Sequence, residues 1–362
     1  MKNKYSEVLE NIPPSGIRKF FDLVIGNDDI ISLGIGEPDF ITPWNIREEA
    51  MYSLEKGYTS YTSNQGLEAL REQIALYVKN RFKAKYDPIK EILITVGVSE
   101  AADITFRALI NPGDEVILPE PCYVCYAPLI KLAGGTVVPL DTSKSNFLVD
   151  PAHLKKKITK KTKMIILCSP NNPTGSVIPK ENLQAIANLA EKHDLWVMSD
   201  EIYSELIYGQ DYTSFAALKN MKKRTILMNG FSKAFAMTGW RIAYICAPED
   251  ILSRVLKIHQ YSILCAPIMA QYAAIEALKN SLYEVEEMRK SYLHRRNMFI
   301  KGLNEIGLPT EIPGGAFYCF PNIKHTGLSS EEFALQLIKK EKVAVVPGNV
   351  FGIGGEGHVR CC

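Results

Sequence analysis

The sequence has no long apolar segment and little net charge. No run of residues approaches the about 18 consecutive apolar positions that a membrane-spanning helix needs. Residues 1–7 contain no apolar core of a secretory signal. The net charge is +2, from 42 basic and 40 acidic residues, so no excess of one sign points to nucleic acid or anionic lipid. We therefore expect a cytoplasmic protein that binds neither membranes nor nucleic acid.

The cysteines offer no complete metal site. Cys122 and Cys125 form a C-x-x-C pair, but no second pair of Cys or His residues has the spacing that would complete four ligands. In a long cytoplasmic chain the eight thiols are expected to stay reduced. We predict neither a metal site nor redox chemistry at this pair.

The sequence does contain an alternation of short apolar runs and helical patterns. Seven runs rich in β-branched residues have the length of strands, at residues 91–96, 115–119, 136–140, 163–168, 195–199, 225–229 and 241–247. Helical periodicity separates them, at residues 66–82, 99–110, 122–133 and 180–193. Runs that are apolar throughout suit strands covered by helices on both faces. The pattern predicts an α/β fold whose large domain has a mostly parallel, seven-stranded sheet.

The pattern changes after about residue 250, which predicts a second, smaller α+β domain. Long helical stretches at 251–279 and 282–306 are followed by strands at 316–320 and 343–346, with a helix at 330–341 between them. A chain of 362 residues also favours two unequal domains. We predict an N-terminal arm and part of the small domain over 1–45, the large domain over 46–270 and the small domain over 271–362.

Polar residues gather just past the predicted strands. In an open α/β sheet, ligands bind outside the carboxyl ends of the strands. The residues that follow those ends are Ser99, Glu100, Tyr123, Asn172, Asp200, Tyr203, Ser232 and Lys233. One crevice is therefore expected to hold an amine, a carboxylate, an amide, phenols and the beginnings of helices.

Several segments resemble the class I aminotransferases, which are pyridoxal-phosphate (PLP) enzymes of fold type I. They are LGIGEPDF (33–40), YTSNQGLEALRE (61–72), SPNNPTG (169–175), SDEIY (199–203), NGFSKAFAMTGWR (229–241), GGAFY (314–318) and VAVVPG (343–348). The resemblance covers nearly the whole chain. It implies that the large domain binds PLP.

The resemblance assigns the catalytic groups. Lys233 is similar to the Schiff-base lysine, an amine that attacks the cofactor's aldehyde and later moves a proton. Asp200 is similar to the carboxylate that keeps the pyridine nitrogen protonated; otherwise it is only a helix cap. Tyr203 and Asn172 would reach the ring oxygen O3′, although the segment around Asn172 also suits a simple turn.

The resemblance also implies a phosphate site and a stacking residue. Ser99 and the backbone N–H of Glu100 begin a predicted helix, which favours an anion, while the Glu100 carboxylate should point away. Arg241 and Ser232 would add a guanidinium and a hydroxyl. The remaining cofactor contacts implied by the family are Tyr123, stacked on the ring, and Tyr61 of the partner subunit. For Tyr123 and Tyr61, ordinary packing is the alternative.

Substrate binding is implied for Arg360, Asn172 and Gly36. Arg360 resembles the arginine that binds the α-carboxylate, and Gly36 would let the backbone approach that carboxylate. Family members continue past the position of Arg360 through a further strand and helix, so we expect residues beyond Cys362. No residue matches a basic partner for a side-chain carboxylate, and strict aspartate specificity is therefore not expected.

These observations predict an aminotransferase that moves an amino group from an L-amino acid to a 2-oxo acid such as 2-oxoglutarate. The mechanism would be ping-pong through Lys233, in a homodimer with shared sites. A PLP-dependent β-lyase uses the same lysine, aspartate and arginines and is the main alternative. A PLP-sensing regulator fused to a DNA-binding domain is a third, which the balanced charge disfavours.

Overall fold

The computed structural model describes residues 5–10, 12–22 and 29–362. Its centre is a seven-stranded sheet in the order β2-β8-β7-β6-β5-β3-β4. The strands are β2 (Ile92–Thr95), β3 (Glu115–Glu120), β4 (Thr136–Asp141), β5 (Thr162–Cys168), β6 (Trp196–Asp200), β7 (Thr225–Gly230) and β8 (Ala243–Cys246). β8 pairs with β2 and β7 in antiparallel orientation, and all other pairs in this sheet are parallel. The predicted α/β fold with a mostly parallel, seven-stranded sheet is confirmed.

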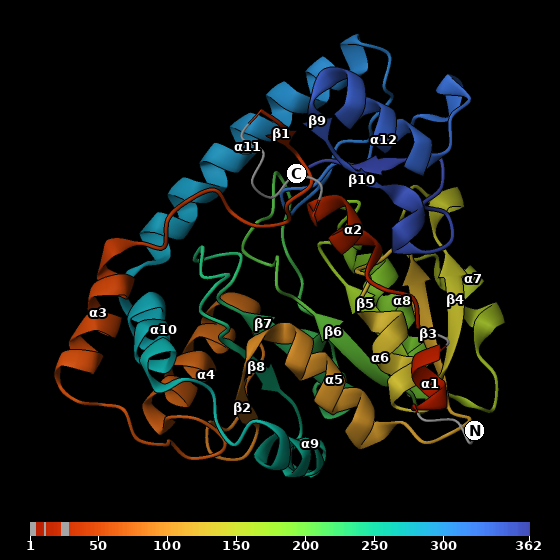
Figure 1. Ribbon diagram of the computed structural model, residues 1–362. Helices are drawn as coiled ribbons and strands as arrows, with labels where there is room; N and C mark the ends of the chain where they lie inside the picture. Colours follow the sequence, from red (N-terminus) through yellow and green to blue (C-terminus); the bar gives the residue numbers. More distant parts are fainter. Residues whose placement is uncertain (1–4, 11, 23–28) are drawn as a thin grey trace.

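Helices cover both faces of the sheet, as the apolar runs predicted (Figure 1). On one face lie α5 (Gly97–Leu109), α6 (Tyr126–Leu132) and α9 (Glu249–Ser262). On the other lie α4 (Glu68–Phe82), α7 (Pro151–Lys157), α8 (Lys180–Lys192) and α10 (Ile268–Asn280). Successive residues of a strand point to opposite faces, so Val197 and Met198 of β6 enter different core clusters. Such burial on both sides makes the strand ends rigid supports for a site.

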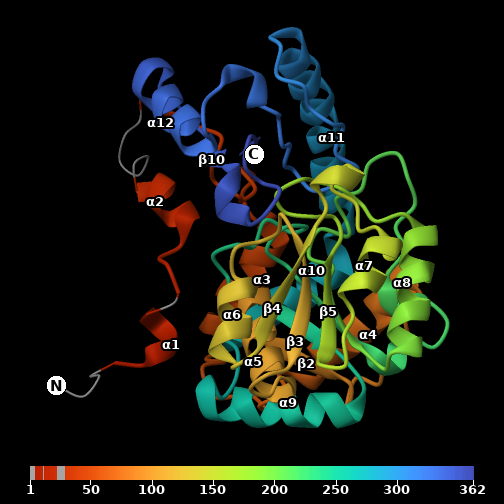
Figure 2. The same ribbon diagram turned by 90° about the vertical axis from the view of Figure 1, so that its right-hand side faces the viewer.

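The C-terminal elements form a smaller layer beside the carboxyl ends of the strands (Figure 1). The long helix α11 (Leu282–Glu305) leads into it from the large domain. This smaller layer also contains α12 (Ser330–Glu341), β9 (Val343–Ala344), β10 (Val346–Pro347) and β11 (Val359–Arg360). Near the N-terminus, β1 (Ile31–Ser32) pairs with β9 in parallel, so this early segment joins the C-terminal layer. Of the remaining N-terminal helices, α1 (Glu7–Glu10) lies beside α6, and α2 (Gly16–Asp22) follows it (Figure 2).

Three predicted elements differ from the structure. The helix predicted over 251–279 is two helices, α9 and α10, because the chain turns between them at Leu264, with a φ of 72°, and at Pro267. The strand predicted over 316–320 is not a strand; its pairing with the chain end is an isolated bridge between Cys319 and Cys361. The strand predicted over 343–346 is divided into β9 and β10, which pair with β1 and β11 in separate sheets. The remaining predicted strands and helices are present, with ends shifted by a few residues.

One helix that the pattern did not predict, α3 (Trp44–Glu55), packs on α10. Five residues of α10 belong to the core of the large domain: Ala270, Ala273, Ala274, Ala277 and Leu278. The predicted boundary between residues 270 and 271 therefore falls inside a helix. The domain limits stay a prediction. Across the described residues, no helix is long and apolar enough to cross a membrane.

Candidate active site

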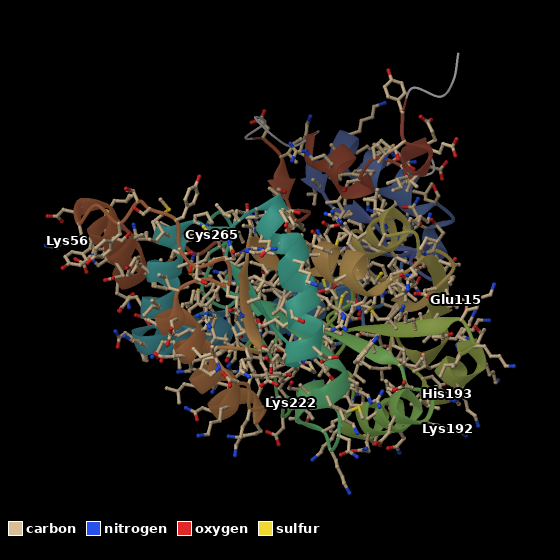
Figure 3. The ribbon with its side chains drawn as sticks, turned by 90° about the horizontal axis from the view of Figure 1, so that it is seen from below. Lys56, Glu115, Lys192, His193, Lys222 and Cys265 are labelled. Atoms are coloured by element: carbon tan, nitrogen blue, oxygen red, sulfur yellow. The ribbon has the colours of Figure 1, made fainter. Side chains whose placement is uncertain are left out.

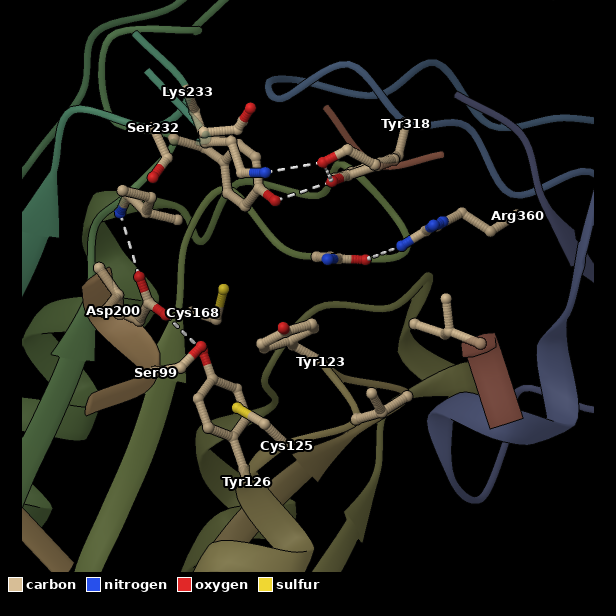
Figure 4. Close-up of a pocket in the computed structure, with 18 of the residues that line it drawn as sticks. Ser99, Tyr123, Cys125, Tyr126, Cys168, Asp200, Ser232, Lys233, Tyr318 and Arg360 are labelled. Atoms are coloured by element: carbon tan, nitrogen blue, oxygen red, sulfur yellow. Dashed lines mark hydrogen bonds between the residues drawn. The ribbon is translucent and has the colours of Figure 1, made fainter. Parts of the chain in front are cut away.

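A cavity of about 280 Å³ opens at the carboxyl ends of the strands (Figure 4). Ten of the residues predicted from the sequence line it: Gly36, Ser99, Tyr123, Asn172, Asp200, Tyr203, Ser232, Lys233, Arg241 and Arg360. They come from segments between residues 36 and 360, so the fold brings together what the chain keeps apart. The cavity is the place where these groups can act on one ligand.

Lys233 lies in the turn that follows β7. The strand ends at Gly230, where an added Cβ would come within 2.7 Å of the Ala243 side chain, so β7 and β8 pack closely. From this turn the Lys233 Nζ donates a hydrogen bond to the Gly36 carbonyl at 2.7 Å. Burial lowers the pKa of Lys233 to about 8. A lysine with this pKa is partly neutral near physiological pH and can act as a nucleophile or base.

Asp200 is the last residue of β6 and is buried. One carboxylate oxygen accepts from the Tyr126 hydroxyl at 2.5 Å, and the other accepts from the Ile202 N–H at 3.1 Å (Figure 4). Burial raises the pKa of Asp200, while these two donors and the nearby charge of Lys233 lower it. The carboxylate is thus held in a fixed direction at the floor of the cavity.

An anion cradle is formed by the start of α5 and Arg241. Gly97, the first residue of α5, has a φ of 79°, and a Cβ there would come within 2.2 Å of the Arg241 Nη2. Only glycine therefore lets the guanidinium lie against this helix end. Arg241 itself has a φ of 54° and donates to the Thr238 carbonyl at 3.1 Å. With the Ser99 and Ser232 side chains at the same cavity, the arrangement suits a phosphate group.

Arg360 approaches from the opposite side and is 2% exposed. Its Nη1 donates to the Asn172 amide oxygen at 3.0 Å, and its Nη2 donates to the Gly34 carbonyl at 2.7 Å. The guanidinium carbon lies 4.6 Å from the centre of the Tyr318 ring. The buried Nε has no hydrogen-bond partner among the described residues. Nη1 and Nη2 each use one of their two N–H groups in the bonds above, which leaves one N–H on each as a donor for an incoming carboxylate.

The phenol side chains of Tyr203 and Tyr318 line the cavity between Lys233 and Arg360 (Figure 4). The Tyr203 and Tyr318 hydroxyls are 2.8 Å apart, and the Tyr318 hydroxyl donates to the Gly36 carbonyl at 3.4 Å. A Cβ at Gly36 would come within 2.7 Å of the Tyr318 hydroxyl, so a larger residue does not fit there. The segment around Gly36 is thereby tied to both Lys233 and Tyr318.

Two predicted site residues lie outside this cavity. The Glu100 side chain turns back to accept from the Val96 N–H and to contact His259, so it points away from the cradle. Tyr61 is 82% exposed and does not line the cavity of its own chain. Its predicted role concerns the site of a second subunit.

Ten of the residues that line the cavity were not predicted from the sequence, among them Tyr126, Tyr318 and Ile17. Tyr126 is the first residue of α6, and no local pattern marks its contact with Asp200. Tyr318 is part of the GGAFY segment but carried no assigned role. Ile17 lies in α2, and nothing in the local sequence indicates that the N-terminal arm returns to the site.

Comparison with known proteins decides the family. The pattern of the family described as "Aminotransferase class I and II" matches residues 28–362. The chain belongs to this family. It is 56% identical over 362 residues to "Putative aminotransferase YugH" of Bacillus subtilis (strain 168), covering 100% of this chain and 94% of that protein. It is 48% identical to an "Aspartate aminotransferase" of Pyrococcus abyssi (strain GE5 / Orsay), covering 98% and 92%.

A solved structure, the "aromatic aminotransferase from Pyrococcus horikoshii OT3", superimposes with a TM-score of 0.90 at 46% identity, over 95% of this chain and 93% of that one. The protein is therefore an aminotransferase, and aminotransferases of this family use PLP. The relatives' names include both aspartate and aromatic enzymes. They do not decide which amino acid this chain takes.

The cavity fits PLP on its own chemistry. The cofactor presents a phosphate, a pyridine nitrogen and an aldehyde, and the cavity presents the anion cradle, the buried Asp200 carboxylate and the Lys233 amine. Among the described residues, Asp200 is hydrogen-bonded but forms no ion pair within 4 Å, although it is buried. A protonated ring nitrogen would supply the missing charge.

Proposed function

We propose that this aminotransferase moves the amino group of an L-amino acid to a 2-oxo acid, with 2-oxoglutarate as an acceptor. The observation that supports this most directly is that the Lys233 amine, the Asp200 carboxylate and the Arg360 guanidinium face one cavity from different sides. An amine is needed to move a proton, and a guanidinium to fix an α-carboxylate.

The chain's own residues divide the work on the cofactor. When bound, PLP acts as the sink for electrons released at the substrate's Cα. Lys233 would hold its aldehyde carbon and would later move a proton at that Cα through Nζ. Asp200, fixed by Tyr126, would keep a proton on the ring nitrogen. Tyr203 and Asn172 would bind the ring oxygen, and Tyr123 would pack on the ring.

The phosphate would be held by four groups: Arg241, the Ser99 and Ser232 side chains, and the first N–H groups of α5, including that of Glu100. A charged group at a helix start is bound without reorganisation of the protein. Arg360 would bind the α-carboxylate, close to the backbone of Gly36. This division places the chemistry on the sheet side and the carboxylate on the opposite side.

We propose a broad donor range that includes aromatic amino acids. Among the residues that the structure describes, the cations that line the cavity are Lys233, Arg241 and Arg360, and each already has a partner in the proposal. Around them lie apolar side chains, among them Ile17 and Val124. A planar or apolar side chain therefore finds more contact here than a second carboxylate does.

The test is a half-reaction. Incubation of the PLP-loaded protein with one amino acid and no acceptor should release one equivalent of 2-oxo acid per site, and later addition of 2-oxoglutarate should yield glutamate. Release of ammonia and pyruvate from a cysteine conjugate, without glutamate, would instead identify the β-lyase. A donor series led by aspartate alone would contradict the proposed range.

We further propose a homodimer whose sites are shared through Tyr61. Tyr61 is 82% exposed in the single chain, so its ring is accessible to a second subunit. Mixing Lys233→Ala and Tyr61→Phe subunits tests the sharing, because a heterodimer would contain one site with both lesions and one with neither. Activity that rises above both parents supports the shared site. A fully active monomer would contradict it.

We also propose a cytoplasmic location. The eight cysteines are all described, and all are free thiols. Unpaired cysteines in this number suit a reducing compartment. Fractionation of cells that express the tagged full chain would test the location.

A further inference from the structure

A carboxylate stands beside the anion cradle. Glu100 occupies the first turn of α5, whose N–H groups face the proposed phosphate site. At such short range a free carboxylate would repel a phosphate. The structure shows where this negative charge is held: one Glu100 oxygen lies 2.6 Å from the His259 Nδ1, and the other accepts from the Val96 N–H.

The position of His259 is set by contacts other than the one with Glu100. The residue is 0% exposed and lies in the last turn of α9, which packs on α5. Its carbonyl accepts from the Ile263 and Leu264 N–H groups, which anchors the end of that helix. A carboxylate only accepts hydrogen bonds, so Nδ1 is the donor. Nε2 has no partner in the described structure, which leaves the contact with Glu100 as the ring's single hydrogen bond there.

We propose that His259 is a positioning residue for the anion cradle, because it holds the Glu100 carboxylate away from the bound phosphate. This inference rests on the proposed function, since it takes the cradle to be the phosphate site of PLP. It assigns a role to a residue that contacts neither cofactor nor substrate. It also explains how an acidic residue is accommodated in the first turn of a helix that binds an anion.

The test compares PLP with pyridoxal, which lacks the phosphate. Dissociation constants of both are measured on the full chain after removal of its cofactor. His259→Leu should weaken PLP about tenfold, because the released carboxylate repels the phosphate, and should change pyridoxal by less than about twofold. Glu100→Gln, which keeps an acceptor for the Val96 N–H, should bind PLP at least as tightly as the unchanged protein.

The decisive protein is the double variant His259→Leu/Glu100→Gln. If His259 acts by holding a charge, removal of that charge should restore PLP affinity to within about threefold of the unchanged protein. If His259 only fills space, the double variant should bind PLP no better than His259→Leu. That result, or an unchanged PLP-to-pyridoxal ratio in His259→Leu, would overturn the proposal.

Two control variants are matched to Glu100 and His259: one removes another carboxylate of α5, and the other replaces another histidine. Asp103→Asn removes a carboxylate one turn further along α5, where Asp103 pairs with Arg107. His193→Leu alters an exposed histidine at the end of α8, away from α9 on the underside of the molecule (Figure 3). Both should leave the PLP-to-pyridoxal ratio unchanged. His259→Asn, whose amide can still donate to Glu100, should bind PLP better than His259→Leu and serves if the leucine variant does not fold.

Inorganic phosphate separates this inference from the proposed function. Its affinity, measured by calorimetry, depends on the cradle and not on Lys233. If neither PLP nor pyridoxal reacts with Lys233 in the unchanged protein, the proposed function fails. A loss of phosphate affinity in His259→Leu that is recovered in the double variant would still support the role of His259.

Discussion

The two sides of the cavity are built in different ways. On the sheet side, Gly97, Asp200 and Lys233 each lie within three residues of the end of a buried strand. On the opposite side, Gly36, Tyr318 and Arg360 come from chain segments that meet only in the folded protein. The hydrogen bond from Tyr318 to Gly36 spans 282 residues, and that from Arg360 to Gly34 spans 326. One side is thus a rigid edge, and the other is an assembly of distant segments.

This difference predicts a difference in function. Groups on the sheet side are oriented by strands that are buried on both faces, which suits the chemistry, where small displacements are costly. Groups on the opposite side are tied together by a few long-range hydrogen bonds, and under the proposed function they bind the substrate's carboxylate. Changes on the first side should therefore lower kcat, and changes on the second should mainly raise KM.

The strongest test of this division is Lys233→Ala. Loss of the amine removes both the covalent link to the cofactor and the base, so kcat should fall by roughly four orders of magnitude or more. Single-turnover formation of 2-oxo acid measures the effect. Lys219→Ala, which alters an exposed lysine, is the control and should be fully active. Near-normal transamination by Lys233→Ala would show that Lys233 is not the catalytic lysine.

Asp200→Asn should lower kcat by about 10²- to 10³-fold, since an amide cannot hold the proton of the ring nitrogen. PLP affinity should change less than kcat does. The matched control is Glu201→Gln, at the next position, because that carboxylate is also buried but accepts from Ser199 and Ser214 outside the cavity. Equal losses in the two variants would show that Asp200 acts through stability alone.

The pH dependence of cofactor binding provides the next test. Burial lowers the pKa of Lys233 from its ordinary value to about 8. The neutral amine is the reactive form, so below pH 8 the rate of reaction with pyridoxal should rise about tenfold per pH unit, and it should level off above pH 8. Stopped-flow absorbance measures this rate in the cofactor-free protein. A rate that keeps rising to pH 10 would mean that burial does not shift this lysine.

On the opposite side, Arg360→Lys should raise KM about tenfold for every donor and acceptor, without changing their rank order. Lysine keeps the charge but loses the planar fork that matches a carboxylate. Steady-state kinetics with at least one aromatic and one acidic donor would measure it. Arg296→Lys is the control, because Arg296 donates to the Pro313 carbonyl and does not line the cavity. A loss of activity with only one donor would show that Arg360 contacts the side chain of that substrate and not its α-carboxylate.

The two sides were also unequally predictable. All seven strands of the sheet could be predicted because each is a short apolar run, and all but the edge strand β4 are largely buried. Once the strands are placed, the residues after them must share one edge, so Asp200 and Lys233 follow from local sequence. Gly36 and Arg360 did not follow from any local pattern; their assignment came from family resemblance.

What the sequence could not show depends on packing between distant segments. The contact of Tyr126 with Asp200 joins α6 to β6, and no periodicity encodes it. The return of Ile17 to the cavity depends on how the N-terminal arm lies on the molecule. In contrast, the break between α9 and α10 had a visible signal in Pro267, which the helical periodicity on both sides outweighed.

The smallest expected effect comes from the hydroxyl that joins the two sides. Tyr318 contacts Tyr203 at 2.8 Å and Gly36 at 3.4 Å, so Tyr318→Phe should cut both ties while keeping the ring that stacks on Arg360. A neutral hydrogen bond contributes about 1 kcal/mol; the bond to Tyr203 should supply most of this effect and the long bond to Gly36 little, which predicts a loss of about five-fold in kcat/KM. Because the tie orients the carboxylate side, most of this loss should appear in KM.

The matched control is Tyr292→Phe. Tyr292 belongs to the same apolar cluster as Tyr318, but its buried hydroxyl has no hydrogen-bond partner among the described residues. Removing that hydroxyl should leave kcat/KM unchanged and should not lower the melting temperature. If Tyr318→Phe behaves like Tyr292→Phe, the two sides are not joined through this hydroxyl. If it lowers kcat alone, Tyr318 belongs with the sheet side, because its hydroxyl then acts through Tyr203 on the chemistry and not through Gly36 on the substrate's carboxylate.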